Sequence, residues 1–123
     1  MGPMNGKIFF DTYAFFEIIS GNPSYEQYKD ADALTTVFNL AELNYGLKKE
    51  IGHDTSDTLT QMFSSYLVEV RAADIQNAMT LKTKKRELSI SDAIGYTIAK
   101  RLNVPFLTGD GDFKDMPGVI LLK

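Results

Sequence analysis

Apolar residues along the chain fall into two alternating patterns: short continuous runs and longer stretches with helical spacing. The runs are rich in residues that favour strands, and runs of this length predict buried strands. Four runs are clear and the one at 66–70 is weaker; the ranges are 7–11, 33–38, 66–70, 105–108 and 118–122. Strands buried on both faces are typical of parallel sheets.

Between these runs, apolar residues recur every three or four positions, which predicts amphipathic helices. The first covers residues 12–20 and ends at Gly21-Asn22-Pro23. Asn39 is the expected N-cap of the second. The later helices are marked by Leu40, Leu43, Leu47 and Ile51, then Leu59, Met62 and Phe63, then Ile75, Ala78 and Met79, and finally Ile94, Ile98 and Leu102 within 91–102.

Strands that alternate with helices predict a three-layer α/β/α sandwich around a mostly parallel, five-stranded sheet. At 123 residues, we expect one domain over residues 1–123. Within this range, we expect Met1-Gly2-Pro3, ahead of Met4, to be a remnant that takes no part in the fold.

Composition narrows the function classes. The chain has no cysteine, which excludes disulfides and thiolate chemistry, and its net charge of −3 disfavours coating nucleic acid by bulk electrostatics. No apolar run approaches the roughly 20 residues that span a bilayer, and no signal peptide is evident. We therefore expect a cytoplasmic protein with no membrane contact.

Acidic residues gather at one predicted place in this fold. In open parallel sheets, ligands bind beyond the carboxyl ends of the strands. Asp11 ends the first strand, Glu42 follows the second, and Asp110 and Asp112 follow the strand at 105–108. Asp92 opens the helix that runs antiparallel to that strand, so it should reach the same edge.

Each acid alone has an ordinary structural explanation. Asp11 and Asp92 suit helix starts, and Glu42 lies almost opposite the apolar stripe of its helix, as a solvent-facing residue would. Together they are costly, because two like charges about 5 Å apart repel by roughly 3 kcal/mol at an effective dielectric of 20. A bound divalent cation would explain the cluster.

The chemistry of the cluster selects the ion and the reaction class. Carboxylate oxygens favour Mg²⁺ or Mn²⁺, whereas zinc is disfavoured in a chain with no cysteine and one histidine, His53. Metal held by a few carboxylates serves phosphoryl-transfer and nuclease chemistry. Catalytic triads and two-histidine ribonuclease mechanisms need residues that this chain lacks. No phosphate-binding glycine motif follows a strand.

Three segments make the chain resemble the PIN domain family, and within it the small VapC-like toxins of prokaryotic toxin–antitoxin pairs. They are FFDTYAFFEI, NLAELNYGL and LSISDAIGYTIAKRLNVPFLTGDGDF, in this order. The last is the most specific, since it joins a helix-opening Asp, an apolar helix, a strand and T-x-D-x-D-F. The resemblance extends from residue 7 to residue 122.

The resemblance implies a metal-dependent endoribonuclease that cuts single-stranded or looped RNA. It makes Asp11, Glu42, Asp92 and Asp110 the catalytic, Mg²⁺- or Mn²⁺-binding set. Asp112 matches an auxiliary acid that could also contact metal, and Thr108 matches a hydroxyl that orients the carboxylates; a plain strand-end Thr is the alternative for Thr108.

The resemblance also implies partners: an RNA substrate, a cognate antitoxin whose tail covers the acidic site, and a second copy of the chain in a homodimer. The main alternative is a catalytically silent PIN-like module that binds RNA or protein. A DNA-directed nuclease of related fold is a further alternative, although the chain has little room for additional DNA-gripping elements.

Overall fold

The computed structural model describes residues 6–123, so the expected remnant at residues 1–3 lies outside the described residues. Within these residues, four parallel strands form one sheet in the order β2-β1-β3-β4. Their bounds are β1 Lys7–Phe10, β2 Asp32–Leu34, β3 Phe106–Thr108 and β4 Val119–Leu121. The predicted parallel α/β fold is confirmed.

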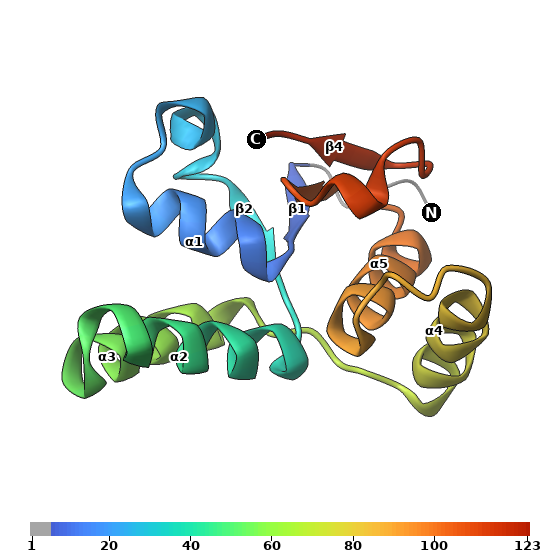
Figure 1. Cartoon of the computed structure of the whole chain (residues 1–123), viewed down its shortest axis with the longest axis horizontal. Coiled ribbons are helices and arrows are strands. Elements are labelled where there is room, and N and C mark those ends of the chain that lie inside the picture. The colour runs from blue at the N-terminus through green and yellow to red at the C-terminus, as the bar shows by residue number, and fades with distance from the viewer. Residues whose placement is uncertain (1–5) are drawn as a thin grey trace.

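In the described part of the chain, five α-helices and three short 3-10 helices connect the strands. The α-helices are α1 Thr12–Ser20, α2 Val37–Ile51, α3 His53–Phe63, α4 Ala72–Lys84 and α5 Ile90–Leu102. The 3-10 helices are η1 Pro23–Tyr28, η2 Ser64–Tyr66 and η3 Gly111–Phe113. Figure 1 shows α1, α2 and α3 on one side of the strands and α4 and α5 on the other.

Alternation of side chains along the strands creates two cores, one on each face of the sheet. Phe9 and Phe106 face α4 and α5, and their rings stack at 5.5 Å between centroids. Phe10 and Leu107, the next residue in each strand, pack with α1 and α2. Successive strand residues point to opposite faces, so these short strands bury both sides as the apolar runs predict.

The sheet has one strand fewer, among residues 6–123, than the five predicted. Residues 66–70 contribute only an isolated parallel bridge between Thr35 and Leu67, beside the end of β2. The second strand also ends at Leu34 rather than at residue 38, because Thr36 is the N-cap of α2 and its hydroxyl accepts the Asn39 N–H. Asn39 is therefore inside the helix, not its cap.

A partly buried ion pair fixes α5 against α4. Asp74 is 2% exposed, and its two carboxylate oxygens accept hydrogen bonds of 2.8 and 3.0 Å from Arg101. Burial would raise the pKa of Asp74, but Arg101 and the Arg71 N–H outweigh it and lower the pKa. The pair therefore holds the helix that carries Asp92.

Removing this pair should be costly. We expect Asp74→Ala to lower the free energy of unfolding by about 2–3 kcal/mol, since it leaves the guanidinium without its partner. Urea unfolding measures the change, with Asp54→Ala on the exposed first turn of α3 as the control. A loss no larger than that of the control would contradict the expectation.

Candidate active site

Asp11 lies at the carboxyl end of β1 and is both the N-cap of α1 and a buried acid, 3% exposed. Its Oδ1 accepts the N–H of Thr12, the first residue of α1, at 2.8 Å. Its Oδ2 accepts the Thr108 hydroxyl at 2.7 Å, across from β1 to β3. Asp11 is therefore an N-cap residue that also contacts the neighbouring strand at the carboxyl edge of the sheet.

The environment of Asp11 opposes its negative charge. Burial, together with the charges of Asp92 and Glu42, outweighs the hydrogen bonds from Thr108 and the Thr12 N–H and raises the pKa of Asp11 to about 7. Ion pairs elsewhere in residues 6–123 join other acids to Lys or Arg, and none involves Asp11. A carboxylate placed this way is uncompensated by protein cations.

Asp92 approaches Asp11 from the first turn of α5. The helix begins one residue earlier than predicted, with Ser89 as N-cap and Asp92 as the reciprocal member of a capping box. Burial is the main reason that the pKa of Asp92 is raised, and the charges of Asp110 and Glu42 contribute. Its capping bonds to Ser89 oppose the shift.

Glu42 is exposed on α2, as its periodicity predicted, yet its carboxylate is held in place. The hydroxyls of Thr12 on α1 and Ser91 on α5 donate to the same oxygen, Oε1, at 3.0 and 2.6 Å. Sequence reasoning gave Thr12 and Ser91 no role in the site. Their signal is position alone, since each directly neighbours a candidate acid.

Thr108, Asp110 and Asp112 form a compact turn after β3. The Thr108 hydroxyl accepts the Asp110 N–H at 3.0 Å while it donates to Asp11. Asp110 is the N-cap of η3 and accepts the Asp112 N–H at 2.9 Å. Asp112 is exposed, and within the described residues its own carboxylate makes no hydrogen bond to the other acids. It stays at the edge of the cluster.

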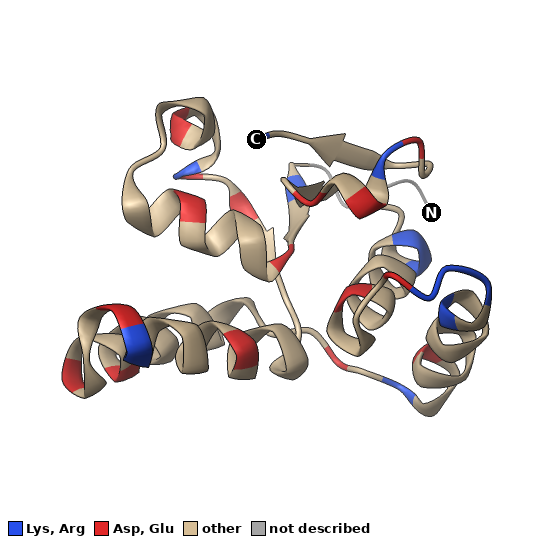
Figure 2. Ribbon diagram, viewed as in Figure 1, with Lys and Arg blue, Asp and Glu red and all other residues tan. Residues whose placement is uncertain are grey.

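The four principal acids thus form one negatively charged cluster at the carboxyl edge of the sheet. Figure 2 shows acidic segments at the β1–α1 junction, in α2, at the start of α5 and in η3. The donor set is all oxygen, which suits Mg²⁺ or Mn²⁺. Across residues 6–123, however, no three acidic or histidine side chains are arranged closely enough to hold one ion as they stand. The chemistry fits a hard cation, and side-chain movement would be needed to enclose it.

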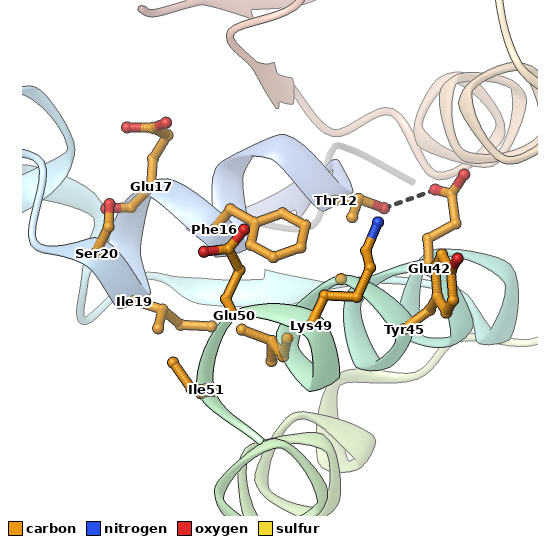
Figure 3. Close-up of a pocket in the computed structure, with 12 residues that line it drawn as sticks. Thr12, Phe16, Glu17, Ile19, Ser20, Glu42, Tyr45, Lys49, Glu50 and Ile51 are labelled. Atoms are coloured by element: carbon orange, nitrogen blue, oxygen red, sulfur yellow. Dashed lines mark hydrogen bonds between the residues drawn. The ribbon is translucent and has the colours of Figure 1, made fainter. Parts of the chain in front are cut away.

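A groove of about 780 Å³ leads away from the cluster between α1 and α2. Thr12 and Glu42 lie at its inner end, and Phe16, Ile19 and Ile51 supply apolar lining (Figure 3). The groove is also bordered by Glu17, Lys49 and Glu50. An apolar groove bordered by two acids and one lysine therefore lies beside the acidic site.

Comparison with known proteins defines the family. The model of the PIN domain family matches residues 8–119, so the chain belongs to the PIN domain family. No curated protein has significant sequence similarity to the chain. No helix among residues 6–123 is long and apolar enough to cross a membrane.

Solved structures share the fold at low sequence identity. A toxin–antitoxin complex from Klebsiella pneumoniae aligns with a TM-score of 0.74 and 21% identity, over 92% of this chain and 95% of that one. VapC20 of Mycobacterium tuberculosis, a toxin that cleaves the sarcin–ricin loop, aligns with a TM-score of 0.77 and 18% identity, over 94% of this chain and 99% of that one. VapBC2 of Rickettsia felis, bound to promoter DNA, aligns with a TM-score of 0.68 and 21% identity, over 94% of this chain and 96% of that one. These neighbours are similar to the chain in fold.

Proposed function

We propose that the chain is a metal-dependent endoribonuclease and the toxin of a toxin–antitoxin pair. The observation that carries the proposal is Asp11: a buried carboxylate with no cationic partner among residues 6–123, surrounded by the charges of Asp92 and Glu42. A structural protein gains nothing from such an arrangement, whereas a site that receives a cation needs it. Membership of the PIN family and the fold shared with VapC toxins support the reaction class.

Asp11, Glu42, Asp92 and Asp110 would hold Mg²⁺ or Mn²⁺, with Asp112 as an outer contact. When bound, the ion would supply Lewis-acid stabilisation of the phosphate and lower the pKa of a coordinated water. The chain's own residues prepare this site. Thr108 and the Thr12 N–H fix both oxygens of Asp11, while Thr12 and Ser91 fix Glu42.

The cleavage products should carry 5′-phosphate and 3′-hydroxyl ends. The chain has one histidine, His53, exposed at the start of α3, so the two-base chemistry that uses the RNA 2′-hydroxyl is unsupported. We expect a substrate with a single 2′-deoxy residue at the cleavage point to be cut at nearly the normal rate. End analysis of labelled fragments tests this, and 2′,3′-cyclic phosphate ends would contradict it.

The partner most suited to the groove is a cognate antitoxin. One of the similar structures is a toxin–antitoxin complex, and another is VapBC2 bound to DNA from its promoter. A segment with apolar side chains would pack on Phe16, Ile19 and Ile51, and a basic side chain at its end would meet Glu42. We propose in addition a homodimer and a cytoplasmic location, where RNA is available.

The alternative is a catalytically silent PIN-like module, favoured by the absence of a closed ion cage within residues 6–123. Labelled single-stranded RNA incubated with increasing Mn²⁺ separates the two, with the matching DNA strand beside it. Metal-dependent RNA cleavage by the wild-type chain, lost in Asp11→Asn, supports the ribonuclease. Binding of RNA without cleavage at any Mn²⁺ concentration supports the silent module.

A further inference from the structure

Glu42 differs from the other acids because nothing in its own helix holds it. Residues at exposed helical positions sample several rotamers, yet donors from two other helices converge on one oxygen of this carboxylate. Among the described residues, no hydrogen bond reaches the second oxygen, Oε2. The carboxylate is therefore oriented, with one oxygen occupied and the other available.

Asn39 determines how Thr12 contributes to this arrangement. The Asn39 side-chain nitrogen lies 3.1 Å from Thr12 Oγ1, and an amide nitrogen only donates. Thr12 Oγ1 must therefore accept from Asn39, and its own hydrogen goes elsewhere. Glu42 Oε1 at 3.0 Å is a better acceptor than the Asn39 carbonyl at 3.5 Å.

Thr36 in turn fixes the orientation of the Asn39 amide. The Thr36 hydroxyl donates to Asn39 Oδ1 at 2.7 Å and accepts the Asn39 N–H at 3.2 Å. With the amide reversed, the Thr12 hydrogen would point to Asn39 and Glu42 would lose this donor. Asn39 and Thr36 are fully buried, so water does not compete for these bonds.

We propose that Asn39, acting through Thr12, is a positioning residue that orients Glu42 for a divalent cation. The proposal rests on the proposed metal-dependent function but makes a separate statement, since it concerns ion affinity and not turnover. Groups that orient metal-binding carboxylates typically change metal affinity by 10–100-fold when removed. Three elements that are distant in sequence, α1, α2 and α5, thus cooperate at one side chain.

The test measures Mn²⁺ affinity by isothermal titration, with RNA cleavage measured in parallel. Thr12→Val removes the hydroxyl and keeps the shape, Thr12→Ser keeps the hydroxyl, and Thr58→Val makes the same change on the exposed face of α3. We expect Thr12→Val to weaken Mn²⁺ binding about 10-fold, with Thr12→Ser and Thr58→Val within about twofold of wild type. The KM for RNA should stay near the wild-type value.

A double-mutant cycle assigns the effect of Asn39 to Thr12. We expect Asn39→Ala to weaken Mn²⁺ binding as well. The double variant with Thr12→Val should bind Mn²⁺ no more weakly than the single variant of lower affinity. If the two losses of Mn²⁺ affinity add up in the double variant, Asn39 does not act through Thr12. The same conclusion follows if Thr12→Val binds Mn²⁺ like wild type, or if Thr12→Ser loses as much affinity as Thr12→Val. If Asn39→Ala does not fold, the Thr12 series decides.

Failure of the proposed function would look different from failure of this inference. If the wild-type chain cleaves no RNA, yet the wild type and its variants show the expected order of Mn²⁺ affinities, the ribonuclease is refuted and the positioning role is supported. A wild-type chain that cleaves RNA, with Thr12→Val unchanged in affinity, refutes the positioning role alone. A chain that binds no Mn²⁺ refutes both.

Discussion

Asp11→Asn should reduce metal-dependent RNA cleavage by about 10³-fold or more, because losing several kcal/mol of electrostatic stabilisation at the reacting phosphate has an effect of that size. Asp11 is the most buried of the candidate acids, and the negative charges of Asp92 and Glu42 act on it. The amide cannot supply the second negative oxygen that an ion would need. Gel assays of a labelled RNA with Mn²⁺ measure the loss.

The same variant should keep its fold. Asn at position 11 still accepts the Thr12 N–H through its side-chain oxygen, and its amide nitrogen can donate to the one lone pair that the Thr108 hydroxyl has left after accepting the Asp110 N–H. Circular dichroism and size-exclusion chromatography check this, with Asp30→Asn on the exposed η1–β2 connection as the matched control. Asp110→Asn should behave like Asp11→Asn, and full activity in both would refute the assignment.

The contribution of Asp11 to the free energy of unfolding of the metal-free protein should fall as pH rises from about 4 to about 7. Its folded-state pKa is raised from 3.8 to about 7, so the folded chain keeps a proton there that the unfolded chain has already released. Folding is then favoured at the acidic end of this range and opposed above it. The contribution is on the order of 2–4 kcal/mol.

Comparison with Asp11→Asn isolates this contribution from other titrating groups. The difference in unfolding free energy between variant and wild type should be near zero at pH 4 and favour the variant at pH 8. Adding Mn²⁺ at pH 8 should stabilise the wild type and not the variant. A difference that stays constant from pH 4 to pH 8 would show that the Asp11 carboxylate is not electrostatically opposed.

Most of the fold could be predicted from apolar patterning because each face of the sheet is buried against helices. Phe9 and Phe10, adjacent in β1, enter opposite cores, which is why the run reads as continuously apolar. The fifth strand could not be predicted correctly, since a single Thr35–Leu67 bridge looks the same in sequence as a short strand. Thr36 was mistaken for a strand residue because Thr favours strands and also caps helices.

The sequence indicated which edge of the sheet the acids occupy, but not which polar residues orient them. Topology alone takes Asp11 and Asp110 to the carboxyl ends of adjacent strands, and the direction of α5 brings Asp92 there. Asn39 was interpreted as a cap, and its buried bond to Thr12 depends on a contact between α1 and α2 that periodicity does not specify. The groove likewise exists only once these two helices pack.

Anomalous diffraction from crystals grown with Mn²⁺ tests the central claim most directly, namely that these acids converge on a divalent cation. We predict an anomalous peak at about 2.1–2.3 Å from an Asp11 oxygen, with at least one of Glu42, Asp92 and Asp110 completing the site directly or through water. The claim would be contradicted if crystals grown with Mn²⁺ showed no anomalous peak near Asp11, or if Mn²⁺ were bound only at other acids.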